Sequence, residues 1–336
     1  MPGVPATPPE LCLIAEPIHP EGERILRAAG IAVRHAAAPD LAAAPQDLAD
    51  ATAVIVRDAL PAAAIDAAPR LAVIANHGTG TDAVDVAHAT ALGIPVVYTP
   101  ASNVQAVAEH AVMLMLAVAR RAVAADRAVR TAEPGYRTRQ ETLSLHGKTL
   151  AVLGFGQTGS RVARMAAGLG MRVLVWSPRT DPQEAARAGA QWLAGLDEAL
   201  AQADVVSLHR PLRPDTRHTL DARTLALLKP TAIVVNTSRG GLIDEAALAG
   251  RLRAGALFGA GLDVFETEPL PPSSPLAGLD NVVLTPHVAG STQDALFETA
   301  SQCARQIVDV LAGRRPEWLV RPEVWERRRR AGGTAD

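Results

Sequence analysis

Short runs of β-branched and other apolar residues alternate with longer helical stretches along most of the chain, and this alternation restricts the fold more than any other feature. Residues 53–56 and 172–176 have the length and composition of buried strands. The helical stretches 21–29 and 84–92 are each followed by glycine. Neighbouring parallel strands need a crossover connection between them, which is usually a helix. The sequence therefore predicts an α/β protein with parallel sheets.

The pattern separates into two α/β units. The strands expected in the first unit are residues 11–15, 31–35, 53–56, 71–75 and 95–98. Those expected in the second are residues 149–154, 172–176, 205–208, 232–236, 259–264 and 282–284. Helices are expected between them, at residues 62–67, 159–168 and 245–254 among others.

A long helix is expected to join the units, from Val104 past Arg130 to the breakers Pro134 and Gly135. A last helix, residues 292–311, is expected to carry the chain back to the first unit. We therefore predict a discontinuous domain of residues 1–102 plus 291–336, and a second domain of residues 103–290.

Composition excludes several classes of protein. The 336 residues suit about two domains. The 33 basic and 35 acidic residues nearly balance, which argues against nucleic-acid binding and provides no basic membrane anchor. Two cysteines, Cys12 and Cys303, cannot form a disulfide scaffold. Residues 1–10 lack the pattern of a signal peptide, and the longest apolar run, residues 111–119, is half a membrane span. We expect a soluble, cytoplasmic protein, and no metal site is predicted.

The glycine motif Gly154-Phe155-Gly156-Gln157-Thr158-Gly159 follows an expected strand and opens an expected helix. In a dinucleotide site the glycines allow a tight turn, close approach of a pyrophosphate, and packing of helix on strand. The amino end of the helix then offers N–H groups to the phosphates. The alternative is a tight turn without a ligand, but the strand and helix on either side favour a dinucleotide.

The next strand ends at Trp176-Ser177-Pro178-Arg179, where an NAD-specific site would carry an acidic residue. Ser177 and Arg179 accommodate a 2′-phosphate instead, so the sequence favours NADP over NAD. The alternative is an unconstrained turn with an exposed arginine.

Three further strands end in polar motifs: residues 236–241 (NTSRGG), residues 263–269 (DVFETEP) and residues 285–291 (TPHVAGS). Parallel strands place such ends at one edge of the sheet, where ligands bind. Arg239 alone would be a surface arginine more often than not, and a lone histidine is usually structural. A histidine that shares an edge with an acid and an arginine is a candidate general acid or base.

These motifs resemble the D-isomer-specific 2-hydroxyacid dehydrogenase family over nearly the whole chain. Residues 77–82 (HGTGTD) are similar to the family's substrate loop, and residues 103–110 (NVQAVAEH) to the start of its interdomain helix. Residues 146–150 and 209–212 are similar to the entry into the cofactor domain and to its fourth strand. The tail at residues 316–325 (PEWLVRPEVW) resembles glyoxylate and hydroxypyruvate reductases.

The resemblance implies a flavodoxin-like substrate domain, a Rossmann domain for NAD(P), and a homodimer formed by the long helix and the loop near Tyr136. It implies that His287 donates a proton as hydride arrives, that Glu268 stabilises the imidazolium, and that Arg239 binds the substrate carboxylate. Glu266 is expected to be an exposed acid.

The remaining site residues combine the motifs described above with what the same resemblance implies. Cofactor contacts are expected from Gly154, Phe155, Gly156, Gln157, Thr158, Gly159, Ser177, Arg179, His209, Pro211, Thr237, Ser238, Asp263 and Gly290. Substrate contacts are expected from Arg57, Gly78, Thr79, Gly80, Asn103, Arg239 and His287. The N–H groups of Gly78, Thr79 and Gly80 are expected to hold the carboxylate, and Asp263 to orient the nicotinamide carboxamide.

We therefore expect an NAD(P)-dependent reductase of small 2-oxo acids, of the glyoxylate and hydroxypyruvate type. Phosphoglycerate or phosphite oxidation on the same scaffold remains an alternative, although a single arginine at Arg57 weighs against a phosphorylated substrate. A non-catalytic NAD(H)-sensing protein, similar to a corepressor, is another alternative, but it would need no proton donor. Glu268 argues against formate oxidation. We expect no regulatory domain after the last helix.

Overall fold

The computed structural model describes residues 9–38, 40–139 and 141–329. The chain divides into two compact units, Met1–Asn103 with Ser291–Asp336, and Val104–Gly290. We call them unit 1 and unit 2. Both are α/β, and every strand pairing within them is parallel. The predicted fold class is confirmed.

Unit 1 contains a five-stranded sheet with strand order β2-β1-β3-β4-β5, which is the flavodoxin-like order. Its strands are β1 (Leu11–Ile14), β2 (Ala32–His35), β3 (Ala53–Val56), β4 (Val73–Asn76) and β5 (Val96–Val97). Its helices are α1 (Pro20–Ala28), α2 (Ala62–Asp66), α3 (Val86–Ala91) and α11 (Gln293–Leu311), with 3₁₀ turns η1 (Pro45–Leu48) and η4 (Pro322–Arg327).

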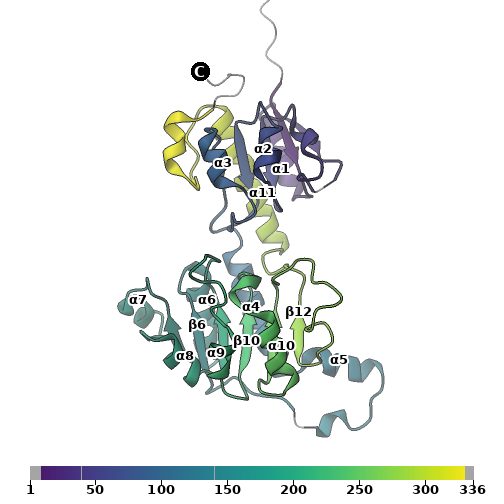
Figure 1. Ribbon diagram of the computed structural model, residues 1–336, viewed down its shortest axis with the longest axis vertical. Helices are drawn as coiled ribbons and strands as arrows, with labels where there is room; N and C mark the ends of the chain where they lie inside the picture. Colours follow the sequence, from purple (N-terminus) through teal and green to yellow (C-terminus); the bar gives the residue numbers. More distant parts are fainter. Residues whose placement is uncertain (1–8, 39, 140, 330–336) are drawn as a thin grey trace, which may run out of the picture. The chain divides into compact units, whose positions relative to one another are not determined.

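Alternate residues of each strand in unit 1 face two separate cores. Leu13 of β1 points to the core shared with α2 and α3, whereas Cys12 and Ile14 point to the core shared with α1 and α11. Gly22 of α1 lies against Ala300 of α11 so closely that an added Cβ would be 3.1 Å from its carbonyl oxygen. Helix α11 therefore covers one face of the sheet in unit 1 (Figure 1).

Unit 2 contains a seven-stranded sheet with strand order β12-β11-β10-β9-β6-β7-β8. Its strands are β6 (Thr149–Leu153), β7 (Arg172–Trp176), β8 (Gln191–Trp192), β9 (Val205–Leu208), β10 (Ile233–Asn236), β11 (Gly259–Leu262) and β12 (Val282–Leu284). Its helices are α4 (Val104–Ala119), α5 (Ala122–Arg130), α6 (Gln157–Gly168), α7 (Pro182–Arg187), α8 (Leu196–Gln202), α9 (Ala222–Ala226) and α10 (Glu245–Arg253), with 3₁₀ turns η2 (Tyr136–Thr138) and η3 (Gly240–Leu242).

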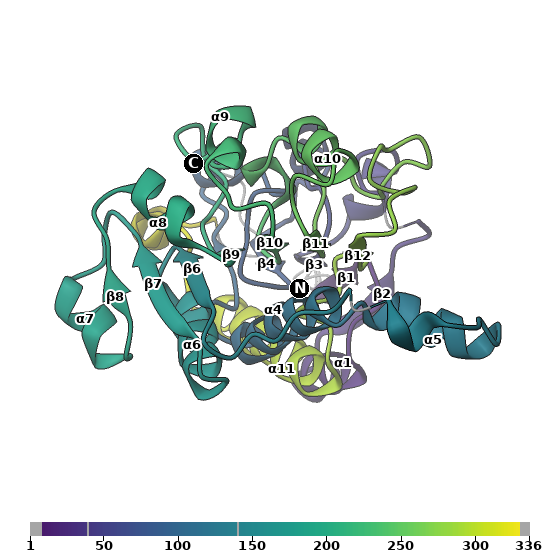
Figure 2. The same ribbon diagram turned by 90° about the horizontal axis from the view of Figure 1, so that it is seen from below.

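The sheet of unit 2 is covered on both faces. Figure 2 shows α9 and α10 on one side, and α4 and α6 on the other. The strand order reverses between β6 and β9, which is the doubly wound switch point where ligands of such sheets bind. The carboxyl ends of β6, β7, β9, β10, β11 and β12 share one edge, so the polar motifs predicted from the sequence lie together there.

The predicted long helix is wrong in one respect, because it is two helices. Helix α4 ends at Ala119, and Arg121 adopts a left-handed conformation with φ of 51° before α5 begins. The Arg121 side chain donates to the Phe258 carbonyl oxygen at 3.1 Å, and its Cζ lies 4.2 Å from the Phe258 ring centre. Helix α5 extends away from the sheet of unit 2 (Figure 2).

Among the described residues, the helices are all too short or too polar to cross a bilayer. Residues 1–8, which carry most of the expectation about a signal peptide, lie outside the described residues, as do residues 330–336 of the predicted first domain.

Candidate active site at the carboxyl edge of unit 2

The loop after β6 fits the glycine pattern of a dinucleotide site. Gly154 has φ of 101°, and an added Cβ would lie 2.5 Å from the carbonyl oxygen of His209. An added Cβ on Gly159 would lie 2.2 Å from the carbonyl oxygen of Gly154. Neither position can hold a side chain without moving backbone, so these two glycines serve the tight turn and the packing of helix on strand.

Gly156 differs from the other two glycines because open space surrounds it, with no atom within 4 Å of an added Cβ. It is the N-cap of α6, and no side chain caps the helix there. The amino end of α6 is therefore exposed at Gly156 and Gln157, with Thr158 half-buried and Phe155 buried below. These residues fit the phosphates of a dinucleotide.

The loop after β10 contributes a second feature that fits a cofactor. The Thr237 hydroxyl is buried and makes no hydrogen bond within the described structure. Ser238 is fixed, because its Oγ donates to the Arg210 carbonyl oxygen at 2.6 Å and its N–H donates to Asn236 at 3.0 Å. A buried hydroxyl without a partner is costly, so a bound polar group would satisfy Thr237.

The remaining predicted cofactor residues also lie at this edge. Ser177 and the exposed Arg179 follow β7, and the Ser177 carbonyl oxygen accepts from the Trp192 indole at 3.3 Å. His209 follows β9, its ring nitrogen Nε2 is 2.8 Å from Ser207 Oγ, and burial lowers its pKa to about 4. Pro211 is exposed. A neutral His209 adds no charge beside the glycine loop.

His287 and Glu268 form an ion pair at the end of β12. Nδ1 of His287 lies 2.7 Å from Glu268 Oε2, and the other carboxylate oxygen accepts from the Phe265 N–H at 2.9 Å. The His287 side chain is 52% exposed, so solvent reaches part of the imidazole ring. A carboxylate on Nδ1 leaves Nε2 as the nitrogen that can transfer a proton.

Pairing shifts the pKa values of His287 and Glu268 in the directions that favour their charged forms. The hydrogen bond that His287 donates to Glu268 raises the pKa of His287, against burial and the nearby charge of Arg239. Burial pushes the pKa of Glu268 upward, but the bonds from His287 and from the Phe265 N–H outweigh it, so this pKa lies below its ordinary value. The imidazolium therefore persists to higher pH than in a free histidine.

Arg239 lies close enough to influence both members of that pair electrostatically. Its Nη1 donates to the Ser238 carbonyl oxygen at 2.7 Å, and the Asn236 amide donates to the Arg239 carbonyl oxygen at 2.8 Å. Gly240 then packs against the loop that carries Glu268, where an added Cβ would lie 1.9 Å from the Phe265 carbonyl carbon. The arginine and the acid are thus positioned by direct backbone contact.

Asp263 is completely buried and organises the loop that carries His287. Its carboxylate accepts from Thr285 Oγ1 at 2.6 Å and from the N–H groups of Val288 and Ala289, each at 2.9 Å. His110 lies 2.9 Å from Thr285 Oγ1 and extends this network to α4. Sequence reasoning missed this role of His110 and Thr285, although both residues stand within quoted motifs. Gly290 follows the loop directly.

Unit 1 carries its own polar edge, in the loop after β4. The Asn76 amide donates to the carbonyl oxygens of Gly78 and Gly80 at 3.0 and 3.1 Å. Thr79 Oγ1 donates to Asn103 Oδ1 at 3.1 Å. The Gly78 N–H, one of three predicted carboxylate donors, already donates to the Asn76 carbonyl oxygen at 2.9 Å.

Sequence reasoning also missed two buried titratable groups beside that loop. Glu16 accepts from the N–H groups of Arg57 and Asp58 at 2.9 and 3.1 Å, so it fixes the backbone of the predicted substrate residue Arg57. His77 is buried, its Nε2 has no partner within the described structure, and burial together with the charge of Arg57 lowers its pKa to about 4. His77 is therefore neutral near pH 7.

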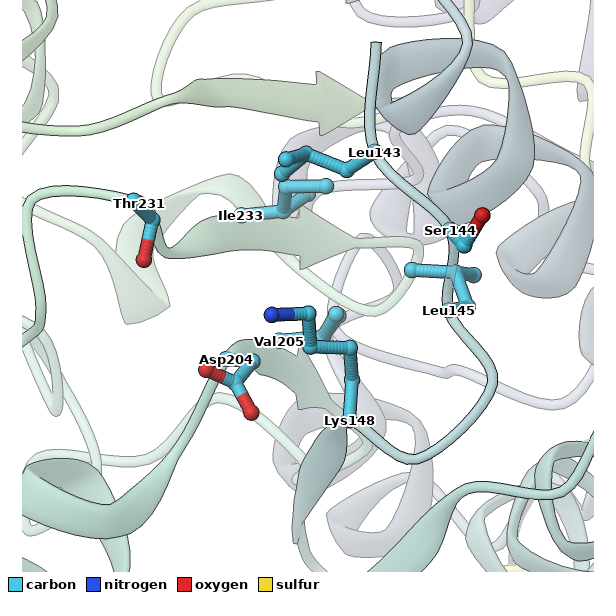
Figure 3. Close-up of a pocket in the computed structure, with 8 residues that line it drawn as sticks. All are labelled: Leu143, Ser144, Leu145, Lys148, Asp204, Val205, Thr231 and Ile233. Atoms are coloured by element: carbon cyan, nitrogen blue, oxygen red, sulfur yellow. The ribbon is translucent and has the colours of Figure 1, made fainter.

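A small pocket opens at the opposite edge of the sheet in unit 2. Its lining includes Lys148, Asp204, Val205 and Ile233, which stand at the amino ends of β6, β9 and β10 (Figure 3). Asp204 is already bound to the Thr149 N–H at 2.8 Å and to Lys229 at 3.0 Å. Ligands of doubly wound sheets bind at the carboxyl edge, so we do not assign the active site to this pocket.

Comparison with known proteins identifies the family. The family described as "D-isomer specific 2-hydroxyacid dehydrogenase, NAD binding domain" matches residues 112–289. A glyoxylate reductase from Aeropyrum pernix is 40% identical over 282 residues, which cover 82% of this chain and 84% of that protein. The chain belongs to the D-isomer-specific 2-hydroxyacid dehydrogenase family.

Other members of this dehydrogenase family differ in length. A D-3-phosphoglycerate dehydrogenase from Mycobacterium tuberculosis is 42% identical over 289 residues, which cover 84% of this chain and 53% of that protein. The chain thus spans about half the length of these phosphoglycerate dehydrogenases. A solved NADPH-dependent glyoxylate/hydroxypyruvate reductase from Sinorhizobium meliloti is 29% identical with a TM-score of 0.83, and the match covers 96% of this chain and all of that one.

Proposed function

We propose that this dehydrogenase reduces small 2-oxo acids of the glyoxylate and hydroxypyruvate type to D-2-hydroxy acids with NAD(P)H. The observation that carries the proposal is the pairing of His287 with Glu268 beside Arg239, at the sheet edge that also holds the glycine loop. A protein that only sensed the nucleotide would need the glycine loop but no proton donor.

Arg239, His287 and Glu268 have different roles in the proposed reduction. Arg239 binds the substrate carboxylate through two parallel hydrogen bonds and polarises the adjacent carbonyl. His287 donates its Nε2 proton to the carbonyl oxygen, and Glu268 stabilises the imidazolium until the transfer. When bound, NAD(P)H supplies the hydride. We further propose that the loop after β4, with Thr79 and Gly80 as main-chain donors, binds a carboxylate.

A steady-state screen of glyoxylate, hydroxypyruvate, pyruvate and phenylpyruvate against NADH and NADPH tests the proposal. We expect the highest kcat/KM with glyoxylate or hydroxypyruvate. Absence of turnover with all four oxo acids, by a protein that still binds the nucleotide, would contradict it.

Oxidation of phosphoglycerate is the second candidate, and the 42% identity to D-3-phosphoglycerate dehydrogenases favours it. Adding 3-phosphoglycerate and NAD⁺ to the same screen separates the two candidates. Turnover of the phosphorylated acid that exceeds hydroxypyruvate reduction would support the second. Arg57 is the residue in unit 1 whose loss should then affect KM for the phosphorylated acid most.

The pH dependence of reduction should follow His287. Because only the imidazolium can donate the proton, we expect kcat to be constant at low pH and to fall as pH rises through the elevated pKa of His287. In Glu268→Gln that falling limb should move to lower pH. Glu266→Gln is the matched control, since Glu266 binds Arg217 and His218 instead. If kcat of Glu268→Gln fell over the same pH range as kcat of the wild type, the proposed effect of Glu268 on the pKa of His287 would be contradicted.

We also propose a preference for NADPH, resting on Ser177 and Arg179 at the end of β7. An acidic residue there would repel a 2′-phosphate, whereas Ser177 can donate to it. In Ser177→Asp the ratio of kcat/KM values should shift toward NADH by about tenfold or more, each tenfold step being about 1.4 kcal/mol. A wild-type protein that strongly favours NADH would contradict this assignment.

We propose a homodimer through α4, α5 and the loop near Tyr136. Val123 and Val129 on α5 are 62% and 83% exposed, so this helix presents two apolar side chains that a second copy of the chain could cover. We expect sedimentation at micromolar concentration to give twice the 35.1 kDa chain mass. The double variant Val123→Asp/Val129→Asp should sediment as a monomer, and a wild-type monomer would overturn the assignment.

A further inference from the structure

Arg210 lies between the glycine loop and the end of β7, and the predicted site residues do not include it. Its Cγ would be 2.9 Å from a Cβ added to Gly154, the first glycine of the loop. Its guanidinium carbon lies 4.6 Å from the centre of the Trp176 ring, and Nη1 donates to Thr219 at 3.2 Å. The Gly154 N–H in turn donates to the Trp176 carbonyl oxygen at 2.9 Å. The arginine is therefore fixed where the ends of β6, β7 and β9 meet.

Arg210 carries its positive charge in surroundings that disfavour it. Burial lowers the pKa of Arg210; among its neighbours, Asp215 favours the charge, whereas Arg213 and Arg179 repel it. The bond to Thr219 uses one of the five N–H donors of a guanidinium. The half-buried Arg210 guanidinium thus keeps donors that suit the oxygens of a phosphate, which arginine binds through charge-assisted hydrogen bonds.

The direction of the side chain distinguishes which phosphate of a dinucleotide it would meet. The pyrophosphate of a dinucleotide would bind over the open Gly156 and the amino end of α6. Arg210 instead reaches Trp176, next to Ser177, and the residues after this strand are those that contact the ribose 2′ position in such folds. Arg210 therefore lies on the side of the site where a 2′ substituent would bind, and not at the open Gly156.

We infer that Arg210 is a second specificity residue for the cofactor, which together with Arg179 binds the 2′-phosphate of NADP(H). The inference rests on the NADPH preference proposed above and adds a residue from a different strand to it. The stacking on Trp176 orients the planar guanidinium, so lysine should replace arginine poorly at this position.

Calorimetric binding of adenosine 2′,5′-bisphosphate and adenosine 5′-monophosphate tests the inference without turnover. We expect wild type to bind the bisphosphate more tightly, and Arg210→Leu to lose at least about tenfold of that advantage while its affinity for the monophosphate changes little. Arg210→Lys should lose part of it. Arg172→Leu is the matched control, because it removes the same charge from the other end of β7, where Arg172 donates to Gln191 and Gln202.

Three results would overturn the inference. If Arg210→Leu kept the full preference for the bisphosphate, Arg210 would be a packing residue. If Arg172→Leu lost the same preference to the same extent, the cause would be the overall positive electrostatic potential of the domain. An equal loss of affinity for both nucleotides would mean that Arg210 contributes to the adenosine site and not to recognition of the 2′-phosphate. Circular dichroism and thermal melting establish that each variant is folded. Reduction of hydroxypyruvate with NADH, measured separately, shows whether the proposed function stands when the inference fails.

Discussion

Replacing His287 with alanine should lower kcat for 2-oxo acid reduction by at least about a hundredfold, since general acid catalysis contributes 10²–10⁴-fold. The cofactor affinity should change little, because the imidazole is held by Glu268 at 2.7 Å and not by the glycine loop. Measuring kcat together with NADPH binding separates these effects. The expected loss is in the chemical step alone.

The chain provides a matched control for His287. His218 also pairs with a carboxylate at 2.7 Å, but its partner is Glu266. His218→Ala removes a histidine–glutamate pair from the same unit without touching the proposed proton donor. Near-normal kcat in His287→Ala, or an equal loss in His218→Ala, would remove His287 from the mechanism.

Replacing Arg239 with lysine should raise KM and lower kcat together, with a loss in kcat/KM of roughly a hundredfold, the size expected when one positioned donor to a developing oxyanion is removed. Lysine keeps the charge but loses the planar fork that matches a carboxylate. Because Arg239 would contact the substrate both before and during reaction, both constants should change.

Arg217→Lys is the control for Arg239, since Arg217 is exposed and binds Glu266 at 3.1 Å. Its kinetic constants should remain close to wild type. If Arg239→Lys changed the melting temperature but neither kinetic constant, Arg239 would be a structural residue.

Most of the fold could be predicted because buried parallel strands have a strong local pattern. Strands β3, β7, β9 and β12 have the predicted bounds, the other predicted strands differ at one or both ends, and β8 was not predicted. The break between α4 and α5 could not be predicted, since Arg121 is neither glycine nor proline. Its left-handed conformation accompanies contacts with Phe258, far away in sequence. Short elements such as β8 and α9 contain too few residues to show a period.

The candidate site divides in the same way. Arg239, Glu268 and His287 each follow a strand directly or in its loop, so parallel topology alone predicts that they share an edge. Arg210 stands between two predicted cofactor residues, yet only its contact with Trp176 from another strand indicates a role. Glu16 was missed for a similar reason, because its bond partners are 41 and 42 residues away.

The buried Asp263 determines when the conformational entropy of the His287 loop is lost. Its carboxylate binds the main-chain amides that follow His287, and the His287 N–H donates back to its carbonyl oxygen at 2.8 Å. These bonds hold His287 in a left-handed backbone conformation with φ of 53°. The proposed proton donor is thus ordered once, when the chain folds. The proposed substrate, glyoxylate, has few atoms to contribute binding energy, and none of that energy need be spent on arranging His287 in each turnover.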